Sequence, residues 1–132
     1  MRWRDGDHCA CLGESLTLRL AAAGKARVHR HGHELHVSVP QPEDEAAVSH
    51  AVHEWWRGQA RTVFQDSIER QFHWFAERGH RLPVLRVKKM RIRWGSFSRR
   101  GYINLSLVLM QYPLAVIHYV VMHELCSLEY MH

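Results

Sequence analysis

The chain has 132 residues, 46% of them hydrophobic, and its 18 basic and 13 acidic side chains give a formal net charge of +5. This length and composition favour one soluble domain with a single core. No apolar run reaches the roughly 18 residues that a membrane-spanning helix needs, so we expect no membrane partner. The basic balance favours contact with polyanions such as nucleic acid, although surplus lysine and arginine more often serve solubility.

The cysteines and the N-terminal segment together predict a cytoplasmic location. The three cysteines, Cys9, Cys11 and Cys126, are an odd number, and the first two lie too close together to bridge each other easily. The first residues carry charge but no apolar stretch that resembles a secretory signal. A reducing compartment fits both observations.

The N-terminal third predicts a loose arm followed by strands. Residues 1–14 show no period and are expected to form the arm, and residues 15–132 are expected to form a single domain. Apolar and polar residues alternate over 15–20 and 33–39, and positions 26 and 28 continue the pattern, which predicts two or three antiparallel strands. Histidines surround Gly32, at positions 29, 31, 33 and 36; we interpret them as a polar hairpin tip, with adventitious metal binding as the alternative.

A long helix is predicted next. Acidic residues at 43–45 follow Pro42 and suit a first helical turn, and apolar residues then recur at three- and four-residue steps. Gly79 is a plausible end of this helix, and Gly58 is a point where it could kink or divide.

Residues 84–110 predict a basic β-hairpin. A strand over 84–98 is followed by the turn SRRG and a second strand from Tyr102. The apolar positions change phase near Lys88 and Lys89, which indicates a bulge there. The first strand is strongly basic, which is typical of a protected sheet edge; phosphate binding is the alternative.

The last predicted element begins at Pro113 and is apolar almost all round, which predicts a largely buried helix. Its two central polar residues are His123 and Glu124, which indicate either a metal site or a pair hydrogen-bonded in the core. In the zinc motif HExxH, two histidines four residues apart grip the ion from one helix face. Here Ser127 occupies the second position, and a neutral hydroxyl is a poor zinc ligand. Cys126 could bind zinc from the same face, or be a small core residue.

The segments RWGSFS, INL and YVVMHELCSL, taken in this order, resemble the YgjP-like metallopeptidase family. The resemblance implies a zincin-like α+β fold, peptide-bond hydrolysis and a Zn²⁺ cofactor. It makes His123 the first zinc ligand and Glu124 the general base, with Ser127 where the second ligand should be. The third ligand would be a histidine shortly beyond the helix. His132 is therefore a displaced ligand, a neighbour of a missing one, or a frayed terminal residue, and we expect the domain to be incomplete at the C-terminus.

Phe97 and Ser106 also depart from the family pattern, standing where the family usually has Cys and Asn. We further expect the final helix to be the most buried element, with His123 turned toward a cleft that contains the RWGS strand. In that cleft, Arg93, Trp94, Gly95 and Ser96 could hold an extended substrate as an added strand, with core packing as the alternative role of the tryptophan.

Two hypotheses about function follow. The first is a zinc-dependent peptidase acting on a peptide or protein substrate, impaired in this chain because zinc would be bound poorly. The second is a non-catalytic zincin-fold module that binds nucleic acid or a protein partner through its basic surface.

Overall fold

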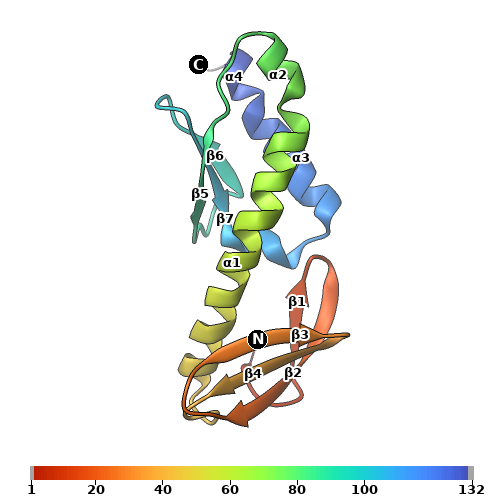
Figure 1. Ribbon diagram of the computed structural model, residues 1–132, viewed down its shortest axis with the longest axis vertical. Helices are drawn as coiled ribbons and strands as arrows, with labels where there is room; N and C mark the ends of the chain where they lie inside the picture. Colours follow the sequence, from red (N-terminus) through yellow and green to blue (C-terminus); the bar gives the residue numbers. More distant parts are fainter. Residues whose placement is uncertain (1, 131–132) are drawn as a thin grey trace.

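The computed structural model describes residues 2–130 and has an α+β architecture in which a long helix connects two sheets (Figure 1). A four-stranded sheet lies at one end of this helix, and a three-stranded sheet lies beside its other half. His132 falls outside the described residues. Within the described range, no helix is both long and apolar enough to cross a bilayer.

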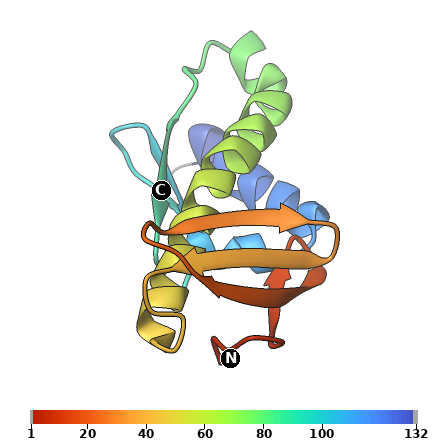
Figure 2. The same ribbon diagram turned by 60° about the horizontal axis from the view of Figure 1, so that its bottom comes forward.

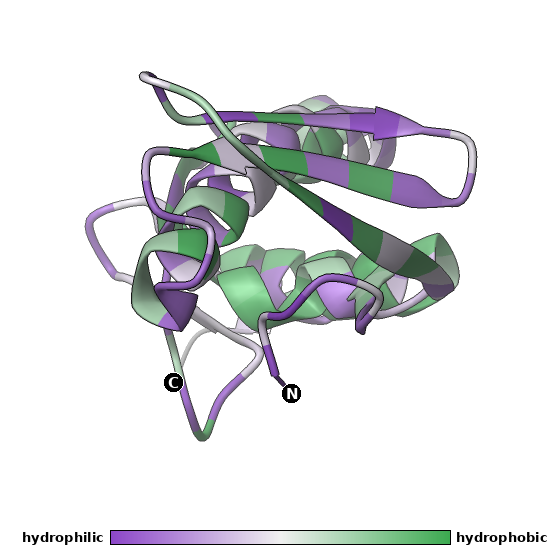
Figure 3. Ribbon diagram, turned by 90° about the horizontal axis from the view of Figure 1, so that it is seen from below, coloured by the Kyte–Doolittle hydropathy of each residue, from purple (hydrophilic) through white to green (hydrophobic). Residues whose placement is uncertain are grey.

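The N-terminal sheet contains β1 (His8–Cys11), β2 (Glu14–Ala22), β3 (Arg27–His31) and β4 (Glu34–Val39) in the order β1-β2-β4-β3. The hairpin at Gly32 is as expected, with a left-handed φ of +61° at the glycine. The expectation of an all-antiparallel sheet is wrong, because β2 and β4 are parallel. β3 lies two positions away from β2 in the sheet, and β4 fills the position between them. Apolar alternation, visible along these strands in Figure 3, reports which face is buried and not strand direction.

The expected loose arm is wrong for residues 8–11. They pair with β2 as the edge strand β1, and the side chains of Cys9 and Cys11 are buried in the core. Burial raises the pKa of the Cys9 thiol to about 12, which makes this cysteine a small apolar core residue. A four-residue strand is too short to show a period, so the sequence pattern could not reveal it.

The long helix α1 (Glu45–Gln71) begins as the acidic residues predicted, with the Asp44 side chain accepting from the N–H groups of Ala46 and Ala47. It is continuous through Gly58, and the break lies instead at Phe72, before the short α2 (His73–Glu77). Gly79 follows with a φ of +88°, the conformation expected of a helix-terminating glycine. The N-terminal sheet lies across one end of α1 (Figure 2).

The expected basic hairpin is partly wrong. Its first strand is two strands, β5 (Val84–Lys88) and β6 (Gly95–Phe97), and both pair with β7 (Tyr102–Ser106) in the order β5-β7-β6. β6 and β7 form the antiparallel hairpin, whereas β5 is parallel to β7. The phase change read as a bulge is the start of a crossing loop, residues 89–94. The Ser106 hydroxyl donates to the Met90 carbonyl at 3.0 Å and so fixes this loop over the central strand.

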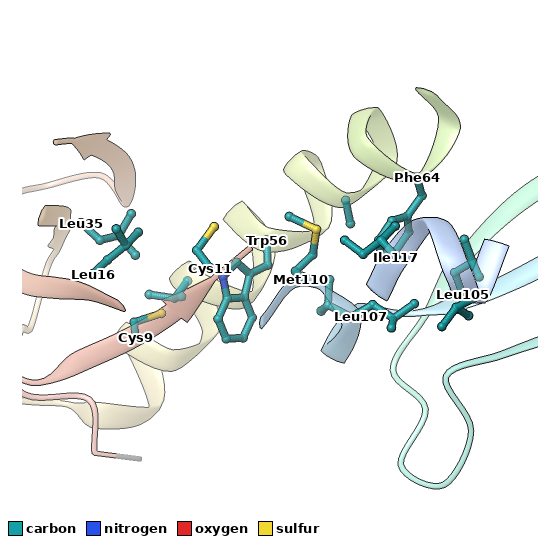
Figure 4. Packing of buried hydrophobic residues seen from close by; sticks show 14 of the residues in the cluster. Cys9, Cys11, Leu16, Leu35, Trp56, Phe64, Leu105, Leu107, Met110 and Ile117 are labelled. Atoms are coloured by element: carbon teal, nitrogen blue, oxygen red, sulfur yellow. The ribbon is translucent and has the colours of Figure 1, made fainter. Parts of the chain in front are cut away.

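After β7 come the 3₁₀ helix η1 (Leu107–Gln111), α3 (Leu114–Leu125) and α4 (Ser127–Tyr130). The expectation that α3 is the most buried element is wrong, because Tyr119 is 70% exposed and Leu114 44%. In β7, by contrast, Ile103 and Leu105 are fully buried. One apolar cluster connects both sheets, passing Trp56 and Met110 on the way (Figure 4). A polar contact adds to it where buried Ser67 of α1 meets the His118 ring of α3, with Oγ to Nδ1 at 2.6 Å.

Candidate active site

A cleft of about 440 Å³ lies between the β6 end of the C-terminal sheet and the C-terminal half of α3. It brings together the two segments that the sequence singled out. HE (123–124) lies on α3, and RWG (93–95) lies just before and at the start of β6. The lining residues are Ile92, Arg93, Trp94, Gly95, Tyr119, Val120, His123 and Glu124.

The strand side of the cleft offers backbone groups. Ser106 N–H donates to Trp94 C=O at 2.9 Å, so these two residues face each other across the β6–β7 pair. In an antiparallel ladder, residues that bond to the partner alternate with residues whose groups point away from it. The N–H and C=O groups of Gly95 and Phe97 therefore point to the free edge of β6, where an added strand could pair.

Gly95 permits the close contact between this strand and the helix. A Cβ atom at this position would lie 3.1 Å from Cγ of Glu124 and 3.2 Å from the carbonyl oxygen of Asn104, closer than ordinary packing allows. The absence of a side chain at Gly95 therefore lets the Glu124 side chain lie directly against the backbone of β6.

Glu124 is half-buried and lines the cleft. Burial raises its pKa above the ordinary value, and the nearby His123 and Arg93 partly oppose this by favouring the charged form. Among the described residues, its carboxylate forms no hydrogen bond or ion pair. A desolvated, unpartnered carboxylate in a cleft is the arrangement expected of a proton acceptor.

His123 lies on the expected side of the helix, since it lines the same cleft as Trp94. It is exposed and not buried, and its ring stacks on Tyr119 with centroids 6.4 Å apart. The buried histidine–carboxylate pair considered as an alternative is therefore wrong: the imidazole is open to solvent at the rim of the cleft.

The other expected substrate-binding residues divide between contact with the cleft and packing within the fold. Trp94 packs against Tyr112, with centroids 5.2 Å apart, yet stays 43% exposed, so it both packs and lines the cleft. The Ser96 hydroxyl accepts from the Asn104 side chain at 3.2 Å and so contacts β7 instead of the cleft. The exposed Arg93 is the cleft's cationic side chain.

The family model for the YgjP-like metallopeptidase domain matches residues 1–132. The chain belongs to this family. Among solved structures it is similar to the crystal structure of the metallopeptidase zymogen of Methanocaldococcus jannaschii jannalysin, with 17% identity and a TM-score of 0.44. That match covers 51% of this chain and 60% of the jannalysin chain, so it spans less than two thirds of that protein. No curated protein matches significantly. The fold is of the expected α+β class.

Metallopeptidase membership implies a metal, and the donor set that residues 2–130 supply does not fit one. Across residues 2–130, no three His, Cys, Asp or Glu side chains are arranged to hold a metal ion. Ser127, at the position of the second ligand, offers only a hydroxyl, and the thiol of half-buried Cys126 packs beside the core. His132, named as a possible third ligand, lies outside the described residues.

An anchor that sequence reasoning missed lies just beyond the cleft helix. Glu129 on α4 accepts from the Arg78 guanidinium and lies 2.8 Å from Nε2 of His80. These partners lower the pKa of the Glu129 carboxyl group to about 2. The signal was weak, because an acidic residue near a helix end and a basic residue 51 positions away show no pattern in the sequence.

Proposed function

We propose that this YgjP-like domain binds extended peptide segments in the cleft between β6 and α3 and is impaired in hydrolysing them. The observation that carries the proposal is the juxtaposition of Glu124 with the free backbone edge of β6. Family membership supports a peptide as the ligand, because the family is one of metallopeptidases.

The expected mode of binding is strand addition. The outward N–H and C=O groups of Gly95 and Phe97 would pair with the backbone of an extended peptide, which gives affinity without requiring one sequence. Exposed Ile92 and Trp94 would contact its side chains, and Arg93 would favour acidic groups near it. Glu124 would lie under the bound backbone, with its raised pKa favouring proton acceptance.

The proposal of impaired hydrolysis rests on the missing zinc ligands. A catalytic zinc usually keeps three protein ligands, and the described residues supply only the imidazole of His123 at the expected positions. Because Ser127 stands at the position of the second histidine, no second imidazole lies one helical turn from His123 to bind the same ion. We therefore derive no hydrolytic step for this chain.

The test measures binding, zinc and hydrolysis on the same protein. A labelled, unstructured peptide should bind, and Trp94→Phe should weaken its binding, whereas the control Trp74→Phe, at a 50% exposed position on α2, should not. Neither protein should retain stoichiometric zinc through dialysis against a mild chelator. Retained zinc together with cleavage of an unstructured test protein, lost in Glu124→Gln, would instead show an active peptidase.

A further inference from the structure

The opposite edge of the C-terminal sheet carries a second groove, which the proposed peptide cleft does not use. It measures about 810 Å³ and runs between β5 and the middle of α1. Residues 82–88 form one side, and Arg61 and Gln65 of α1 form the other. We propose that this groove is a docking site for an acidic, extended segment of a partner protein, which adds to the sheet as a strand beside β5.

The backbone of β5 has free pairing groups. Val84 N–H donates to Gly101 C=O at 2.9 Å, so Val84 faces β7. Because the residues of a parallel strand alternate in the side to which they bond, the groups of Leu85 and Val87 point away from β7. The Val87 carbonyl accepts from the Arg57 guanidinium at 3.1 Å, which leaves Leu85 N–H, Leu85 C=O and Val87 N–H for an incoming strand.

The charges around the groove select the partner. Arg61, Arg86 and Lys88 are exposed, and within the described residues no salt bridge engages them. Arg86 is held in place by its guanidinium over the Tyr102 ring, 3.4 Å from the centroid. A strand carrying Asp or Glu would therefore meet cations on both sides of the groove.

The apolar surface of the groove favours a polypeptide over a nucleic acid. Val84 is 58% exposed and Leu82 is 44% exposed, and both line the groove. An extended peptide alternates its side chains, so acidic residues on one face could meet Arg86 and Lys88, while apolar residues on the other face would lie on the same side as Leu85 and Val87. A second copy of this chain is disfavoured, because two β5 edges would bring like charges together.

The experiment uses a fluorescein-labelled hexapeptide of alternating Glu and Val, followed by fluorescence anisotropy on the whole chain. We expect saturable binding that Arg61→Glu combined with Arg86→Glu weakens by about tenfold or more, since two attractive contacts become repulsive. The matched control is Lys25→Glu combined with Arg27→Glu, at exposed positions of the N-terminal sheet away from the groove, which changes net charge equally and should leave binding unchanged.

Amide hydrogen exchange separates strand addition from charge attraction alone. Bound peptide should protect the Leu85 amide and leave the Arg86 amide, already directed at β7, unchanged. The proposal is overturned if peptide does not bind, if both double variants weaken it equally, or if Leu85 gains no protection. Tighter binding of a single-stranded oligonucleotide than of the peptide, or self-association that the groove variant abolishes, would also overturn it. Because Trp94→Phe leaves this groove intact, failure here is distinguishable from failure of the cleft.

Discussion

Glu124 and Glu129 lie five positions apart in the C-terminal helical region, and their surroundings shift their acidities in opposite directions. Burial without a partner raises the pKa of Glu124, whereas Arg78 and His80 lower that of Glu129 to about 2. One carboxylate lies in a cleft, and the other fastens α4 to the segment after α2. A candidate reactive carboxylate in this fold therefore lacks hydrogen-bond and ion-pair partners, whereas a structural carboxylate has several.

The largest expected effect on stability comes from filling the space beside Gly95, where the Glu124 side chain lies. Gly95→Val should destabilise the fold by about 2–3 kcal/mol, because a side chain there would press on Glu124 and on the Asn104 carbonyl. Urea denaturation measures the change. Gly24→Val, at a glycine with nothing near its would-be Cβ, is the matched control and should cost much less. Equal losses in both variants would refute the proposed close contact.

Removing the charge on Glu129 should give the next largest effect. Because its folded-state pKa is depressed, the stabilisation is present above its ordinary value of 4.5 and disappears as the pH falls toward 2. Glu129→Gln should lower the melting temperature at pH 7 and flatten the loss of stability between pH 5 and 2. Thermal melts over this pH range measure both, and an unchanged acid profile would contradict the role of the anchor.

Supplying the missing imidazole tests the Glu124 side of the comparison. Ser127→His places histidines four residues apart, one near the end of α3 and one at the first residue of α4, and the helical φ and ψ of Cys126 between them keep the two positions near one face. Zinc affinity should therefore rise about tenfold or more. Calorimetric titration with Zn²⁺ measures it, and Ser127→Ala serves as the control, with no gain expected. Hydrolysis should not appear from this change alone. Unaltered zinc affinity in the histidine variant would rule out the assumed geometry of positions 123 and 127.

The smallest expected effect is a gain in stability. The raised pKa of Glu124 means that its charged form is disfavoured in the fold, so this group opposes folding increasingly as pH rises through and above its ordinary value. Glu124→Gln should therefore raise the melting temperature slightly at pH 7 and leave it unchanged at pH 3. A loss of stability at neutral pH would indicate that the carboxylate forms a favourable contact instead.

Local signals in the sequence predicted the elements better than their arrangement. The acidic residues 43–45 and Gly79 correctly bracketed the long helical region, because the signals at helix ends depend on neighbouring residues alone. The parallel pairs β2–β4 and β5–β7 were missed, because alternation is identical in parallel and antiparallel strands when one face is buried. The exposed side of α3 was missed for a similar reason, since apolar residues such as Tyr119 do not reveal which of them lack a covering element.

The candidate site was predictable where it rests on a motif and unpredictable where it rests on contacts. HE and RWG pointed to the two sides of the cleft, and the structure brings them together. The intimate packing of Gly95 on Glu124 could not be read from positions 29 residues apart, since any glycine in a strand suggests only a turn, a bulge or a close approach. The roles of His123 and Glu124 in chemistry stay predictions.

The uninterrupted α1 has a consequence for any attempt to divide this molecule. Its first half supplies Val48, Val52 and Trp56 to the core that includes the N-terminal sheet, and its second half supplies Phe64 and Ile68 to the core beside α3. A cut within α1 would leave two fragments that each expose apolar surface normally covered by the other's helix. We therefore expect the two sheets to unfold as one cooperative unit, and the cleft and the basic groove to require the whole chain for study.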